Sequence, residues 1–62
     1  MENYDVIIEN DQEFKIVYKY EKKSVLAITY VNGYELKKRG DTRQDAYDAL
    51  RQAVYLTLNF RL

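Results

Sequence analysis

The stretch KKRGDTRQDAYDAL, residues 37–50, marks the point at which the chain changes from strand to helix. Gly40 ends a run of strand-type residues, and Thr42 follows as a residue whose hydroxyl can accept a hydrogen bond from the first helical turn. Asp45 stands three residues later, close to the acidic position of a capping box, and suits the positive end of the helix dipole. The stretch therefore predicts a helix that begins near residue 43.

The predicted helix runs from about residue 43 to residue 59 and carries an apolar stripe of mostly small side chains. The residues of this stripe are Ala46, Ala49, Leu50, Ala53, Val54 and Thr57. The final segment, VYLTLNFRL (54–62), also alternates as a strand would. Because no Gly, Pro or turn cluster interrupts it, we expect the helix to continue. The alternative is a short helix followed by an edge strand or a swapped arm.

Two alternating runs rich in β-branched and aromatic residues precede this stretch and predict strands. They are YDVIIE (4–9) and FKIVYKY (14–20), joined by the turn residues NDQE (10–13). We assign the even-numbered residues of both runs to the face that packs on the helix. This assignment places Ile7 and Val17 on the opposite face.

A second hairpin is predicted between residues 24–31, SVLAITYV, and the strand that begins at Tyr34. Asn32-Gly33 separates them, and Asn-Gly between apolar runs favours a tight type I′ turn because both positions tolerate positive φ. We assign the face that carries Leu36 to the core. The sequence thus predicts a single α+β domain over residues 1–62, an antiparallel sheet of three or four strands with one C-terminal helix packed on one face.

The small size of the chain favours self-association. A domain of 62 residues buries only about 60% of the surface that its unfolded chain exposes. Small scaffolds are usually stabilised by disulfides, a metal or a partner, and this chain has no Cys and no His. We therefore expect a homodimer.

One helix cannot cover both faces of such a sheet, so the second face is predicted to carry an apolar patch. Its apolar residues are Ile7, Val17, Leu26, Ile28 and Tyr30. The charged residues expected around them are Asp5, Glu9, Lys15, Lys19, Glu35, Lys37 and Arg39. An apolar centre with a charged rim is typical of a protein-binding surface. We expect the apolar residues, with Lys15, Lys37 and Arg39, to bind a partner and to mediate self-association; scattered surface hydrophobic residues, or a wrong face assignment, are the alternative.

Acidic and basic residues balance in number, ten of each, but not in position. Residues 2–13 contain acids and no base, whereas residues 15–39 are mainly basic. We expect strand pairing to bring these segments side by side. The alternative is a basic patch for phosphate, which makes a small nucleic-acid-binding protein with residues 19–23 and 37–39 the second hypothesis. No RNA-recognition signature accompanies the seven tyrosines.

Composition also argues against several other functions. Without Cys or His there is no thiolate or imidazole zinc site and no Ser–His or Cys–His nucleophile pair. Asp45 and Asp48 are the nearest approach to a carboxylate pair, and capping explains Asp45 better. We expect no enzymatic activity and no cofactor. No apolar run approaches the ~20 residues that cross a bilayer, and no signal peptide is visible, so we expect a cytoplasmic protein that does not contact membranes.

Two segments are similar to HicB-type antitoxins. YDVIIENDQEFKIVY (4–18) resembles the opening hairpin of that family, and GDTRQDAYDALRQAVYLTL (40–58) resembles its Gly-Asp-Thr helix start and later Ala-Leu pattern. The chain departs from the family in lacking a Leu-Pro-Gly-Cys-like stretch before the Gly-Asp-Thr, and we expect no counterpart of the family's DNA-binding domain. The resemblance implies a β-β-β-α fold, self-association, and a surface that binds and neutralises a protein partner such as a toxin or a host enzyme.

Overall fold

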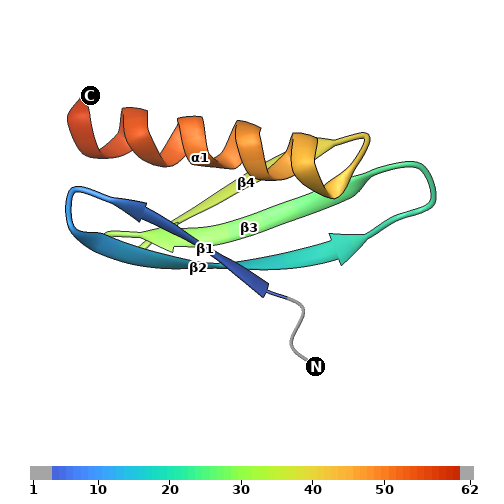
Figure 1. The fold of residues 1–62 in the computed structure, drawn as a ribbon, viewed down its shortest axis with the longest axis horizontal. Helices are drawn as coiled ribbons and strands as arrows, with labels where there is room; N and C mark the ends of the chain where they lie inside the picture. The colour runs from blue at the N-terminus through green and yellow to red at the C-terminus, as the bar shows by residue number, and fades with distance from the viewer. Residues whose placement is uncertain (1–3, 61–62) are drawn as a thin grey trace.

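The four strands and the helix follow one another along the chain in a computed structural model that describes residues 4–60. They are β1 (Tyr4–Glu9), β2 (Gln12–Tyr20), β3 (Val25–Val31), β4 (Tyr34–Gly40) and α1 (Arg43–Asn59). The strands form one antiparallel sheet in the order β1-β2-β3-β4, and α1 lies along one face of it (Figure 1). The predicted α+β class is confirmed, with four strands.

The β3–β4 hairpin forms as the sequence predicts. Asn32 and Gly33 have φ values of 51° and 84°, as a type I′ turn requires. The turn places Thr29 opposite Leu36 on the helix side and Ile28 opposite Lys37 on the other side. Gly33 suits this position because glycine adopts a φ of 84° without steric cost.

The β1–β2 hairpin corrects the face assigned to β1. Asn10 and Asp11 both have positive φ and form a two-residue loop, so β2 begins at Gln12, earlier than predicted. Opposite residues of an antiparallel pair share a face, and Ile7 lies opposite Phe14. Ile7 is therefore on the helix side, where it is fully buried, and its predicted place on the opposite face is wrong.

Asp5 and Glu9 lie on the helix side with Ile7, whereas Val6 and Ile8 lie on the face without the helix. Ile8 is 64% exposed there, and Val6 lies beside it along the strand on the same face. The prediction that Tyr4 faces the helix concerns a side chain outside the described part of the chain.

The core lies between α1 and the sheet, mainly over β3 and β4. Its buried hydrophobic residues are Ile7, Ile16, Tyr18, Val25, Ala27, Val31, Ala46, Leu50 and Val54. Thr29 is also buried, and its hydroxyl donates a hydrogen bond of 2.6 Å to the carbonyl of Lys15. Tyr20 and Tyr34 lie on the predicted face but at strand ends, and both remain more than half exposed.

Residues 40–45 carry the groups that end β4 and begin α1. The Thr42 hydroxyl accepts a hydrogen bond of 3.1 Å from the amide of Asp45, and the Thr42 carbonyl accepts one of 3.0 Å from the amide of Ala46. A Cβ atom on Gly40 would lie 2.5 Å from the amide nitrogen of Ala46, so the chain needs glycine where it passes beneath the first turn. The helix continues to Asn59, which confirms the prediction for the described part of residues 54–62; Arg61 and Leu62 lie outside it.

Replacing Thr42 by Ala is expected to lower the free energy of unfolding by about 1 kcal/mol, because one amide of the first turn loses its acceptor. Thr42→Ser keeps the acceptor oxygen and is the matched control. Chemical denaturation measures both variants. Equal midpoints for wild type and Thr42→Ala would show that the cap does not stabilise the fold.

Replacing Gly40 by Ala is expected to destabilise the protein more than replacing Gly33 by Ala. A methyl group at residue 40 would collide with the backbone of α1 and force the helix away from the sheet. A methyl group at residue 33 would meet no other atom, so the cost there is the ~1 kcal/mol of conformational strain at positive φ. Thermal unfolding of the two variants measures the order. The opposite order would contradict the close approach of the strand end to α1.

Candidate functional site

The face of the sheet opposite α1 is the candidate site, and we call it the helix-free face. Its apolar patch consists of Val6, Ile8, Val17, Leu26, Ile28 and Tyr30. The side chains of Val17 and Tyr30 are 59% and 62% exposed, although both belong to a strand in the middle of the sheet. The site is therefore an exposed apolar surface on regular strands.

The register of the strands brings most of the predicted site residues together. Val17 lies directly opposite Ile28, and Leu26 and Tyr30 flank Ile28 along β3. Lys37 lies on the far side of Ile28, where β4 pairs with β3.

Lys15 and Arg39 lie beside the patch, opposite Val6 and Leu26 respectively. Ile7 is the predicted site residue that the structure removes from this face, and Val6 and Ile8 are the ones that the sequence analysis missed. The Asn-Asp turn would have identified them, because a two-residue loop fixes the parity of the pairing.

Glu35 joins the rim of the patch to its centre. Its Oε2 atom accepts a hydrogen bond of 3.0 Å from the hydroxyl of Tyr30, and its Oε1 atom lies 3.7 Å from the Lys37 Nζ. The hydrogen bond to this carboxylate raises the pKa of Tyr30. All three side chains are exposed, so these contacts orient the groups and contribute little to stability.

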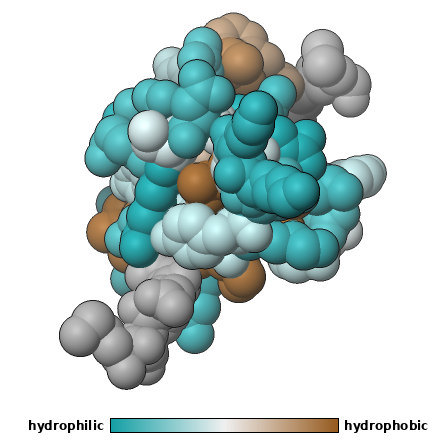
Figure 2. Space-filling view, turned by 90° about the vertical axis from the view of Figure 1, so that its right-hand side faces the viewer, coloured by the Kyte–Doolittle hydropathy of each residue, from teal (hydrophilic) through white to brown (hydrophobic). Residues whose placement is uncertain are grey.

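A second rim contact lies where β2 turns into β3. Arg39 donates to both carboxylate oxygens of Glu21, at 2.8 and 3.3 Å, and Ser24 donates to Glu21 at 3.0 Å. These hydrogen bonds, that from Arg39 first, lower the pKa of Glu21. Figure 2, which faces this end of the molecule, shows a mostly hydrophilic surface.

The acids of β1 lie on the helix side, which corrects their predicted place in the rim. Asp5 accepts a hydrogen bond of 2.9 Å from the Tyr18 hydroxyl and lies 3.3 Å from Nη2 of Arg43. The Arg43 guanidinium carbon lies 4.4 Å from the centroid of the Tyr18 ring. Burial and the hydrogen bond to Asp5 raise the pKa of Tyr18 to about 12. This cluster ties β1 and β2 to the start of α1.

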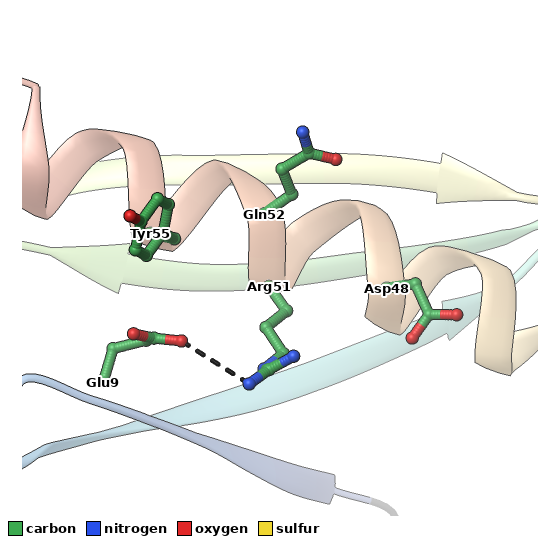
Figure 3. A pocket seen from close by; sticks show the side chains of 5 residues that line it. All are labelled: Glu9, Asp48, Arg51, Gln52 and Tyr55. Atoms are coloured by element: carbon green, nitrogen blue, oxygen red, sulfur yellow. Dashed lines mark ion pairs between the residues drawn. The ribbon is translucent and has the colours of Figure 1, made fainter.

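Glu9 makes a similar connection further along the helix. Figure 3 shows Arg51 extending from α1 toward Glu9, with 3.7 Å between Nη2 and Oε2. The two side chains border a hollow of about 490 Å³ that is also lined by Asp48, Gln52 and Tyr55. The acidic and basic segments do lie side by side, since β1 pairs with β2, and the acids Asp5 and Glu9 of β1 form ion pairs with arginines of α1.

Neither helix-side cluster has the composition of a metal site. Within residues 4–60, no group of three or more His, Cys, Asp or Glu side chains could hold a metal ion. Over the same residues, α1 is too short and too polar to cross a bilayer.

Comparison of the chain with protein-family models, with curated proteins and with solved structures finds no match in any of the three. The similarity to HicB-type antitoxins therefore stays a prediction from the residues of the two segments alone.

The stability advantage of wild type over Tyr18→Phe is expected to shrink as the pH rises from 10 to 12. A pKa raised from 10.0 to about 12 in the folded state means that the neutral phenol stabilises the fold below pH 10 and that this contribution is lost as pH rises through 12. The loss amounts to at most ~1.4 kcal/mol per pH unit. Urea denaturation across this pH range measures the free energy of unfolding of both proteins. If the difference between them does not change with pH, the hydrogen bond and burial proposed to raise the pKa of Tyr18 are contradicted.

Proposed function

We propose that this protein is a non-catalytic interaction module that binds a protein partner through the helix-free face and occludes the partner's functional surface. The observation that carries this proposal is the exposure of Val17 and Tyr30, which belong to the two inner strands of the sheet. Large exposed apolar patches with polar rims are typical of protein–protein interfaces. The resemblance to HicB-type antitoxins, which implies neutralisation of a protein partner, points in the same direction.

The charges around the patch indicate the chemistry of the partner. The basic residues of this face are Lys15, Lys19, Lys37 and Arg39, and the acidic ones are Glu13 and Glu35, with Glu21 at the adjoining turn. Basic groups therefore outnumber acidic ones, and Lys37 and Arg39 are paired with Glu35 and Glu21. A partner with an apolar patch and an acidic rim fits this arrangement, because complementary charges fix the orientation and speed association. Docking of this face on a second copy would oppose two basic rims, so we place self-association elsewhere, as argued below.

Nucleic-acid binding is the second hypothesis, and one observation favours it: the strand pairing gathers basic residues at one end of the sheet. Lys19 and Arg39 lie on either side of Leu26 there. Two features favour a protein partner instead. Tyr30 is the one aromatic side chain of the described patch, whereas single-stranded nucleic acid is bound by several stacking platforms. In addition, Arg39 is already paired with the carboxylate of Glu21, which would repel a phosphate group.

The test compares wild type with Val17→Glu, a change at an exposed position in the middle of the patch, after both have been shown to have the same melting temperature. Tyr55→Glu, on the exposed side of α1, is the matched control. Proteins captured from a lysate by wild type and by Tyr55→Glu, but not by Val17→Glu, are purified and titrated against each variant. Val17→Glu is expected to raise Kd by about tenfold or more, because central interface residues contribute more than ~1 kcal/mol.

Two results would contradict the proposal. One is that no purified protein distinguishes Val17→Glu from wild type. The other is tight, strongly salt-dependent binding of short single- or double-stranded DNA or RNA that Val17→Glu leaves unchanged, which would favour the second hypothesis.

A further inference from the structure

The β4 strand forms one edge of the sheet. Among residues 4–60 it pairs with β3 alone, which leaves the amide and carbonyl groups of its other side without a strand partner. Such an edge is a template for pairing with another chain. Its sequence, YELKKRG from Tyr34 to Gly40, carries an acid followed two residues later by a base.

We propose that two copies of this protein form a symmetric dimer by antiparallel pairing of β4 with β4, in the register that places Leu36 on the two-fold axis. In this register Glu35 of each copy lies opposite Lys37 of the other on the helix-free side. Opposite residues in an antiparallel pair have Cβ atoms about 5 Å apart, so two ion pairs form. On the helix side Leu36 meets its own copy, and Tyr34 lies opposite Lys38.

Charge selects this register over its neighbours. If Lys37 lies on the axis, the two copies of Lys37 face each other. Arg39 then lies opposite Glu35 of the second copy and can bind it only by giving up its ion pair with Glu21. With Lys38 on the axis, Lys37 lies opposite Arg39, and with Glu35 on the axis, two acids face each other. Like charges directly opposite destabilise a strand pair. Lysines on an edge strand usually prevent pairing with another chain. On β4 they oppose the neighbouring registers and are compatible with the register centred on Leu36.

The helix side of the same edge is shaped to receive a second helix. A hollow between β4 and α1 is lined by Lys38, Ala49, Gln52, Ala53, Leu56 and Thr57. Leu56 is 44% exposed at this hollow. Since α1 lies mainly over β3 and β4 and strands are about 4.8 Å apart, the two helix axes of the dimer would lie about 10 Å apart. That distance is within the usual packing range for helices of about 8–10 Å, and two small alanines permit it.

The other edge of the sheet, β1, does not offer an equivalent partner. Its charged residues, Asp5 and Glu9, are both acidic, so a second β1 would bring acids together. Pairing of β1 with β4 of another copy would build an open filament. The acids of β1 are already engaged by Arg43 and Arg51, and they lie on the face opposite Lys37.

Sedimentation equilibrium over a range of protein concentrations tests the dimer. Wild type is expected to change from 7.5 kDa to twice that mass. Glu35→Lys and Lys37→Glu are each expected to weaken the dimer by about tenfold or more, because both ion pairs become like-charge pairs. An equimolar mixture of the two variants is expected to regain the wild-type affinity, since every opposed pair is then complementary. Leu56→Asp tests the helix contact and is expected to weaken the dimer as well.

Amide hydrogen exchange of wild type supplies a readout that does not depend on any variant: β4 amides are expected to become protected as concentration rises. A mass that stays at 7.5 kDa at ~1 mM, growth beyond the dimer, or failure of the mixed variants to recover would each overturn the inference. Val17→Glu separates it from the proposed function, because this change is expected to leave the dimer intact. Loss of the dimer in Val17→Glu alone would place the second copy on the helix-free face.

Discussion

The packing of α1 against β3 and β4 is the interaction on which the rest of the structure depends. A helix is about 10 Å wide, whereas four strands at about 4.8 Å spacing extend over about 19 Å. One helix therefore shelters about half of one sheet face. The close approach is possible because Ala27 and Ala46 are small where they are fully buried, and because Gly40 has no side chain to hold the first turn away.

Both candidate interaction surfaces follow from this shortage of helical cover. The helix-free face keeps aliphatic side chains in the middle of its strands, and the outer edge of β4 keeps its backbone groups beside a hollow in which α1 exposes Leu56. The charges differ between the two surfaces. Basic groups outnumber acidic ones around the apolar patch, whereas two antiparallel copies of β4 would place Glu35 of each opposite Lys37 of the other. We therefore propose different occupants for them: a foreign protein with an acidic rim for the helix-free face, and a second copy for the β4 edge.

Much of the fold could be predicted from local sequence patterns, because turn and capping residues determine the strand register and the start of the helix. Asn32-Gly33 determines the register of β3 and β4, and Gly40 with Thr42 determines where the helix begins. The face of β1 could not be read from its own residues, since Val6, Ile7 and Ile8 are all apolar and alternation alone does not choose between the two faces. The turn at residues 10–11 chooses, and it also moves the acids of β1 from the rim of the patch to the helix side. Most of the candidate site on β2, β3 and β4 was predictable, and the contribution of β1 was not.

The attachment of β1 has a consequence for how the molecule opens. This strand has β2 on one side and few contacts with α1, and of its described residues Ile7 alone is buried in the core. Among the described residues, polar contacts also join this strand to the helix: Asp5 with Arg43, Glu9 with Arg51, and the 3.3 Å hydrogen bond from the Tyr47 hydroxyl to the Val6 carbonyl. Detachment of β1 costs less free energy than global unfolding when so little surface is shared. Proteolytic nicking of the native protein is therefore expected to be concentrated at the first hairpin, since each detachment of β1 would leave β2 as the outermost strand.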